Sequence, residues 1–570
     1  MDITAGTNLK NESEMKKYFF YLSTLALLAA ACNKLDNNST PIEEEPAPAV
    51  QMITETVSGG RGTSTKATIA ANASFAWTVG DNVAVHVSNG DSHKYVVTSS
   101  GASVAAASAK FEVTYEDGYS RDAFAIYPST IVAENAANYG QSGQPLDVTL
   151  PSSYTLDQVS DETSPCPMIA TNAPDAGWDF YQLCGLLRLT VNSIPPSTKR
   201  LEISFDGKKV AGNFAISDPK GDGSSTIALA DASGSNSSVI TINNSGNTFY
   251  SGWGDGKMFN IPLPVGTYTN ITVTAYNALS GGDAVLSMTC PFAYTASKEY
   301  GAKRTASFPV FSVSADKRVL FSPGNLQATT TDLGANWTWH FAEHQYDYIG
   351  EKTANNQING DGTVAENGTV DLFQKSTTSY TTYGISNSGD YDKLYIGTFK
   401  DWGNIDIDGK GANYWRTLTT ASSSGEWGYV LNSRSTGIQI NGTNNARYTM
   451  AQVNTDGTSV NGLILIPNGF VGGDFAGVTW GTINAASNWT TMCSTDGWKS
   501  LEAAGCVFLP ITARRQNSKG TFDINFRNAG TYLGNYKKGT AAMVFQTSGV
   551  SGYTTINYNA GAVRLVHEVK

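Results

Sequence analysis

The 570-residue chain is poor in charge. Asp, Glu, Lys and Arg make up only 15% of it, against about 25% in typical soluble domains. The net charge is −11 and no basic cluster stands out. Nucleic-acid binding needs a positively charged footprint, so the sequence argues against a nucleic-acid partner. Thinly spread Lys and Arg argue equally against binding to an anionic membrane surface through protein charge.

Cysteine is also scarce. The six cysteines contain no CxxC spacing and no dense array, which excludes a scaffold built from disulfides. Cys493 and Cys506 could pair, although burial as small apolar side chains explains them equally well. The same burial explains the other cysteines that follow Cys32, which are Cys166, Cys184 and Cys290.

The sequence has one apolar run that stands out, from Tyr18 to Ala31. Lys16 and Lys17 precede it, and three alanines followed by Cys32 end it. This layout predicts a signal peptide over 15–31, because the run is too short to cross a bilayer of about 30 Å comfortably. The junction resembles a bacterial lipobox, which implies that Cys32 becomes the lipidated first residue. The alternative is an ordinary signal peptide with an incidental cysteine.

The segments on either side of the signal peptide carry little apolar surface. Residues 1–14 are polar and acidic, and we interpret them as a start-site artefact upstream of Met15. Residues 32–50 are rich in Pro, Asn, Ser and Glu, a composition that cannot repay the entropy of ordering. We therefore expect a flexible, lipidated tether that joins the outer membrane to the first domain.

The remainder is typical of a mainly β protein. Short runs of Val, Thr, Tyr and Ile alternate with clusters of Gly, Asn, Asp and Ser. Val83, Val85 and Val87 share one strand face, and a turn at 89–91 predicts a hairpin. The length is too great for one core. We expect two tandem β-sandwiches, at 51–190 and 191–312, followed by an α+β domain at 313–570.

Five blocks in the first segment occur in a recognisable order: WTVGDNVAVHV, AFAIYPST, VTLPSSYTLDQ, PCPMIATN and LCGLLRLTV. With PLPVGTYTNITVTAYN further on, they resemble the fimbrillin-like family of Bacteroidales surface lipoproteins and type V pilus subunits. The resemblance covers about 51–312 and implies a two-sandwich protein. It also implies partners, which are other fimbrial subunits held by strand exchange.

Arg61 lies in a glycine-flanked stretch before the first strong strand. In polymerising fimbrillins a trypsin-like protease cuts near such a position, and loss of the leading strand opens a groove for a neighbour's strand. The resemblance therefore makes Arg61 the first candidate for proteolytic maturation and Lys66 the second. An anchored lipoprotein that is never cut is the alternative.

The third segment carries a different set of markers, which run from VLFSPGNLQ to the closing VRLV. The series resembles a domain of Bacteroidetes surface proteins, and its end resembles the formylglycine-generating-enzyme-like group, a branch of the C-type-lectin-like fold. That fold includes both enzymes and binding proteins. The sequence predicts short helices within 424–434 and 497–505, and a buried closing strand in AVRLVHEVK.

Few residues of the third segment suit catalysis. Its histidines are His340, His344 and His567. WTWHFAEH alternates like a strand, which would separate the first two histidines by more than about 10 Å on one face. No third metal ligand is evident, so we expect structural histidines and no catalysis.

Two other candidates concern binding. Asn404, Asp406 and Asp408 resemble the start of a calcium loop, but Trp415 stands where a glutamate is wanted, so a solvated turn competes with calcium. Aromatic residues that suit sugar or protein ligands are numerous, although we expect most to fill the core: Trp337, Trp339, Trp402, Tyr414, Trp415 and Trp427.

These observations favour a non-enzymatic, lipid-anchored protein of the outer-membrane surface or of a fimbrium. The leading hypothesis is a minor or tip subunit whose C-terminal domain contributes adhesion to a glycan or host protein. A stand-alone glycan- or protein-binding lipoprotein is the first alternative. An enzyme that uses the formylglycine-generating-enzyme-like domain is the second.

Overall fold

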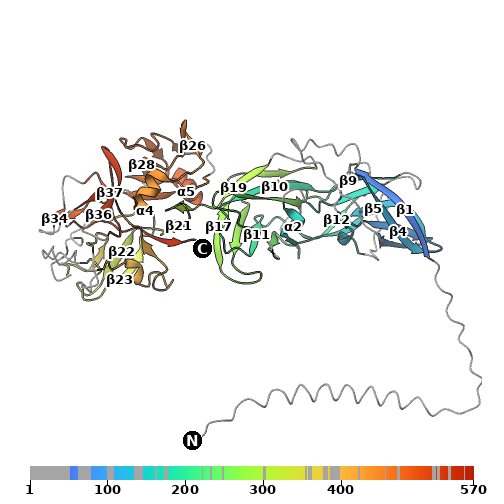
Figure 1. Ribbon diagram of the computed structural model, residues 1–570, viewed down its shortest axis with the longest axis horizontal. Helices are drawn as coiled ribbons and strands as arrows, with labels where there is room; N and C mark the ends of the chain where they lie inside the picture. The colour runs from blue at the N-terminus through green and yellow to red at the C-terminus, as the bar shows by residue number, and fades with distance from the viewer. Residues whose placement is uncertain are drawn as a thin grey trace, which may run out of the picture. The chain divides into compact units, whose positions relative to one another are not determined.

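Strands dominate the computed structural model of the chain, so the prediction of a mainly β fold is confirmed. The structure describes residues from Met52 to Lys570, and Ile53–Lys570 form one compact unit (Figure 1). The description leaves out residues 1–51, 62–76, 78, 99–107, 134–144, 161–163, 172–176, 221–222, 231–233, 245, 247–248, 299–302, 353–355, 357, 359–362, 376–382, 386–397, 422–423, 456, 471–474, 517–520, 523–526, 537–540 and 557–558. None of the helices within this description has the length and apolar character needed to span a membrane.

The N-terminal region is built on a seven-stranded sheet. Its strands lie in the order β3 (Ser92–Val97), β2 (Ala84–Asn89), β5 (Ser120–Tyr127), β8 (Met168–Thr171), β9 (Trp178–Gln182), β1 (Met52–Arg61) and β4 (Ser108–Glu116). The predicted hairpin is confirmed: Asn89 pairs with Ser92, and Gly90 adopts the positive φ that the turn requires.

Alternation along these strands supplies two cores. Val83, Val85 and Val87 lie in one core together with Trp178 and Phe180. Ala84, Tyr95 and Ile126 occupy the intervening positions and lie in the other core. The second core also holds residues of the two-stranded sheet of β6 (Leu146–Leu150) and β12 (Gly212–Ile216). Both faces of the sheet are therefore occupied by apolar side chains.

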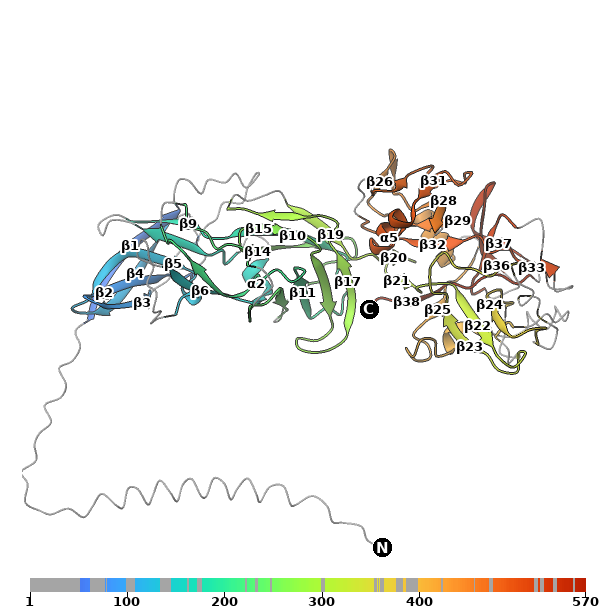
Figure 2. The ribbon, with the colours of Figure 1, turned by 180° about the vertical axis from the view of Figure 1, so that it is seen from behind.

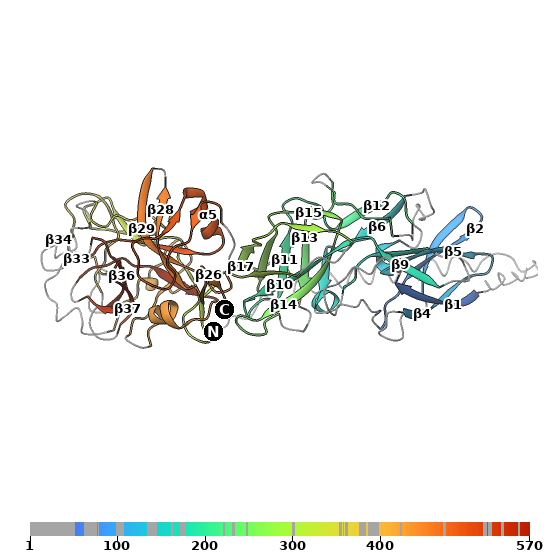
Figure 3. The same ribbon diagram turned by 90° about the horizontal axis from the view of Figure 1, so that it is seen from above.

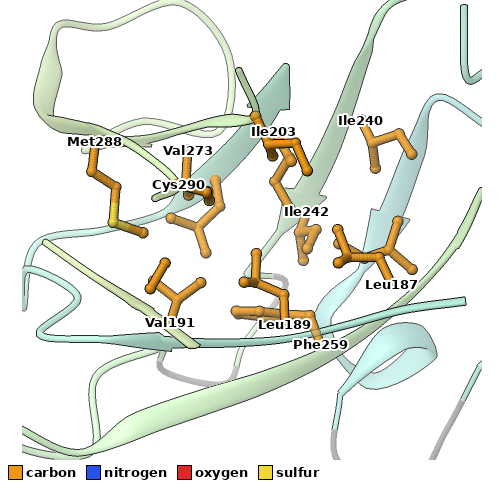
Figure 4. Packing of buried hydrophobic residues seen from close by; sticks show 14 of the residues in the cluster. Leu187, Leu189, Val191, Ile203, Ile240, Ile242, Phe259, Val273, Met288 and Cys290 are labelled. Carbon is orange, nitrogen blue, oxygen red and sulfur yellow. The ribbon is translucent and has the colours of Figure 1, made fainter. Parts of the chain in front are cut away.

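The middle region is a β-sandwich. One sheet has the order β17 (Ala284–Thr289), β16 (Thr272–Tyr276), β11 (Arg200–Ser204), β13 (Val239–Asn243) and β7 (Ser153–Thr155). The other has β14 (Gly256–Leu263), β10 (Gly185–Asn192) and β19 (Arg304–Ser307). Figure 4 shows the core between them, where Leu189 and Phe259 lie opposite Ile203 and Ile242.

The expected boundary between residues 190 and 191 needs correction, because it falls inside β10. Leu187, Leu189 and Val191 of this strand all pack in the core of the middle β-sandwich, and β10 pairs with β14 and β19. β7 and the short helix α2 (Leu156–Val159) also contribute to that core. Only Leu183 and Cys184 separate β9 from β10, and both are fully buried.

The C-terminal region contains several small sheets (Figure 2). One sheet has the order β20 (Phe311–Ser312), β21 (Arg318–Phe321), β38 (Leu565–Glu568) and β25 (Arg416–Thr417), and a second has β23 (Thr338–Phe341), β22 (Leu326–Thr330) and β24 (Gly368–Val370). A third sheet has the order β30 (Val478–Thr479), β31 (Thr491–Cys493), β28 (Tyr448–Thr455), β29 (Thr458–Leu465) and β32 (Val507–Pro510). A fourth has β35 (Gly530–Leu533), β36 (Ala541–Gln546) and β37 (Gly549–Thr555).

Both predicted helices are present. α4 (Glu426–Gly428) continues as the π-helical turn η5 (Tyr429–Ser433), where Arg434 N donates to Tyr429 O over 3.1 Å. α5 (Thr495–Ala503) begins after Ser494, whose hydroxyl accepts from Gly497 N. Gly505, with positive φ, follows its end, as a helix C-terminus favours.

Candidate functional site

The leading strand β1 lies inside the first sheet (Figure 3). It is hydrogen-bonded between β9 and β4, and it runs parallel to β9. The register pairs Gly59 with Trp178 and Arg61 with Phe180. Arg61, the first maturation candidate, is thus the last residue of β1. Lys66 and Cys32 lie outside the described residues.

The apolar surroundings of β1 come from its neighbours. Trp178 and Phe180 of β9 are buried, and Ile53 of β1 is only partly buried against the same core. Trp77 packs edge-on against Phe180 and Phe111, with ring centroids 5.2 Å and 5.0 Å apart. A cut after Arg61 would leave β1 held by noncovalent contacts alone. Its departure would expose the backbone groups of β9 and β4, which form a template for another strand.

The aromatic residues of the C-terminal region divide by exposure. Trp402 and Trp427 are fully buried and Trp415 nearly so, which confirms the expectation of a core role for these three. Trp337 and Trp339 are partly buried against the core that holds Trp402 and Trp415. Tyr414 differs because 39% of it is exposed.

Tyr414 lies in a small aromatic cluster. Its ring stacks on His567 with centroids 4.8 Å apart, and it meets Trp415 edge-on at 5.1 Å. Burial lowers the pKa of His567, which favours the neutral imidazole. The cluster therefore offers an uncharged aromatic surface, of the kind that stacks on sugars or on other aromatic rings.

The three histidines of this region have separate surroundings. His340 Nε2 lies 2.8 Å from the hydroxyl of Thr329, and its Nδ1 lies 3.0 Å from Phe341 O. His344 stacks on Tyr346. The expectation that His340 and His344 share one strand face is wrong, because β23 ends at Phe341 and His344 lies in the turn that follows.

The predicted calcium loop forms a closed turn. Asp406 Oδ1 accepts from Gly411 N over 2.7 Å, and Asp408 adopts a positive φ. Asn404, Asp406 and Asp408 are exposed. Trp415, at the position where a glutamate is wanted, is buried and has no oxygen to offer. The turn thus closes through its own hydrogen bonds, while calcium binding stays a prediction.

The cysteines within the described residues are free thiols, so Cys493 and Cys506 do not form a disulfide. Both are buried. Burial raises the pKa of Cys493 to about 12 and raises that of Cys506 as well. A protonated, buried thiol is a poor nucleophile and a poor metal ligand.

Sequence reasoning missed a polar cluster in the first sheet: His86, His93 and Asp122. A signal was present, because His86 alternates with Val85 and Val87 and therefore lies on the opposite face from those valines. The position of Asp122 depends on a shift in register between β2 and β5, and no sequence pattern predicts that shift.

Comparison with known families and with curated proteins finds no family model and no curated protein that matches this chain.

Proposed function

We propose that this chain is a cell-surface lipoprotein of the fimbrillin-like kind, which joins a fimbrium as a minor or tip subunit and contributes adhesion. The observation that carries the proposal is the place of β1. It ends at Arg61 and lies between β9 and β4, with neighbours on both sides. One proteolytic cut could therefore convert a complete sheet into an acceptor for a neighbour's strand.

The closing strand β38 supports a terminal position. It lies between β21 and β25, and Leu565 and Val566 are fully buried. Withdrawing it for donation would expose these side chains at a cost of roughly 1.5–3 kcal/mol each. A subunit that accepts a strand but does not donate this one would end a fibre, with the C-terminal region outward.

Tyr414 supports the alternative of a stand-alone binding lipoprotein. Its exposed ring and the neighbouring His567 could take a glycan or a protein side chain without any assembly. In both proposals acyl chains on Cys32 hold the protein to the outer membrane.

Limited digestion with an arginine-specific protease tests the main proposal. We expect a cut after Arg61, slow release of the segment that contains β1, and oligomers that appear only after release. Arg61→Ala should remain intact and monomeric, and Lys66→Ala serves as the matched control. A cut protein that keeps β1 and stays monomeric would favour the stand-alone lipoprotein.

Position in the fibre is tested by immunogold labelling of residues 313–570 on sheared pili. We expect gold at fibre ends. Gold spread evenly along the shafts would refute the terminal position, and absence from pili would remove the fimbrial role.

The lipid anchor is tested by Cys32→Ser. The substitution should move the protein from the membrane fraction to the soluble fraction. An unmodified mass for the wild-type protein, with unchanged fractionation, would overturn the anchor.

A further inference from the structure

Three side chains that can ligate metals meet on one face of the first sheet. His86 comes from β2, His93 from β3 and Asp122 from β5. The hairpin pairs Ser88 with His93 and His86 with Tyr95, so the two histidines are diagonal neighbours on the same face. Their rings stack with centroids 5.4 Å apart and planes only 11° apart.

A bulge supplies the third member. β2 and β5 lose register between Val85 and Val87: Val85 pairs with Ala125, while Val87 pairs with Arg121. The extra residues on β5 include Asp122, whose Oδ2 lies 2.7 Å from His86 Nδ1. Bulges re-aim side chains in this way and are frequent beside functional sites.

The cluster combines burial with access. His86 is fully buried, whereas His93 and Asp122 are partly exposed, so a small ion could reach the group from solvent. An aspartate is ordinarily a carboxylate at neutral pH, which is the form in which Asp122 can ligate a metal.

The distances are close to those that a metal needs. One donor atom from each residue lies within 4.8 Å of the other two. Tetrahedral zinc, with bonds of about 2.0–2.1 Å, holds its ligand atoms about 3.4 Å apart. To surround one ion, the three donor atoms would have to move closer together than they lie in this structure. Within the described residues, this is the one group of three or more His, Cys, Asp and Glu side chains so placed.

We propose that His86, His93 and Asp122 bind a divalent transition metal ion of the zinc class. Two imidazoles and one carboxylate suit zinc, copper or nickel, whereas calcium and magnesium prefer oxygen ligands throughout. Three protein ligands leave a fourth position for water. The ion would join the edge hairpin of β2 and β3 to β5, and binding to the folded state alone would stabilise this sheet.

The test uses the full chain, purified in detergent and treated with a chelator. Cobalt(II) chloride should produce the visible absorption of four-coordinate cobalt at one equivalent, and zinc chloride should displace it. Zinc should also raise the midpoint of thermal unfolding. Loss of a residue that only hydrogen-bonds to a metal ligand weakens metal binding by about 10–100-fold. His93→Gln and Asp122→Asn each remove a ligand itself, so each should weaken zinc binding by more than that.

His344→Gln is the matched control, because His344 is an exposed histidine of the C-terminal region. It should leave the cobalt spectrum and the zinc titration unchanged. Circular dichroism of His93→Gln without metal checks that the sheet still folds. Binding that is absent in the wild type, or unchanged in a folded His93→Gln, would overturn the site and leave the contact between His86 and Asp122 a structural one.

Discussion

β1 and β38 are both central strands, but their described side chains are buried to different extents. β1 has β9 and β4 as neighbours, and β38 has β21 and β25. The described side chains of β1 are weakly held: Met52 is 56% exposed and Ile53 is only partly buried. Leu565 and Val566 of β38 are fully buried. The comparison teaches that backbone pairing alone does not fix a strand, because retention depends on the apolar surface that its side chains bury.

A buried arginine adds to the difference. Arg564 immediately precedes β38 and is fully buried, and its Nη2 donates to Gln345 Oε1 over 2.8 Å. Gln345 Oε1 also accepts from Phe508 N, which ties the closing strand to β32. Burial lowers the pKa of Arg564 to about 10. A charge placed there is tolerated only while its hydrogen bonds persist, so removal of the strand would disrupt more than apolar packing.

The largest expected effect comes from deleting each strand in turn. A chain without residues 562–570 loses the buried side chains of Val563, Leu565 and Val566. The loss of their burial lowers the free energy of unfolding by about 4.5–9 kcal/mol, which is comparable with the whole stability of a domain. We expect the C-terminal region to lose its cooperative unfolding transition. A chain without residues 1–61 should keep that transition and self-associate through its open sheet. Equal damage from the two deletions, seen by calorimetry, would remove the contrast.

A smaller effect is expected from single truncations of side chains. Leu565→Ala creates a cavity in a buried site and should lower the free energy of unfolding by about 2–5 kcal/mol. Ile53→Ala, at a partly buried position, should cost about 1 kcal/mol or less. Urea unfolding monitored by tryptophan fluorescence gives both values. If Ile53→Ala proved the costlier change, β1 would be the better-held strand.

The smallest expected effect is the contribution of His567, in β38, to the pH dependence of the free energy of unfolding. Burial lowers its pKa below the ordinary value of 6.5. The unfolded state therefore binds more protons than the folded state as pH falls through 6.5, and stability decreases in that window. Above about pH 6.5 the contribution is fully present.

His567→Gln should reduce the loss of stability between about pH 7.5 and about pH 5.5. His344→Gln is the control, and its free energy of unfolding, measured in urea, should depend on pH as it does in the wild-type protein. If the free energy of unfolding of His567→Gln kept the wild-type dependence on pH, His567 would not be the responsible group.

Residue patterns predict much of the fold. They do not predict that a strand of one expected segment packs in the core of the next. Alternation predicts the β2–β3 hairpin, and the spacing of Trp427, Val430 and Leu431 predicts a helical turn. The boundary at 190 failed because the alternation of Leu187, Leu189 and Val191 in β10 shows which face is buried but not which core that face enters. Periodicity gives the face of a strand but not its partner.

The candidate sites also differ in whether the sequence alone can reveal them. Arg61 is a candidate because of the resemblance to the fimbrillin-like family and its glycine-flanked position, and neither of these requires knowledge of the fold. The cluster of His86, His93 and Asp122 joins residues up to 36 positions apart in number, from 86 to 122. Two of its members follow from the hairpin register, but Asp122 depends on a bulge, which reflects tertiary packing rather than local preference.

The short junction between β9 and β10 has a mechanical consequence. Leu183 N donates to Pro167 O, and Leu183 O accepts from Ile227 N, so the two-residue link is itself built into the structure. Leu183 and Cys184 share a core with Phe214 of β12 and with Ile227. Tension applied along β9 would pass into β10 without a slack linker to extend first. The load would therefore reach the ladder of β10 with β14 without first straightening a loop between the two sheets.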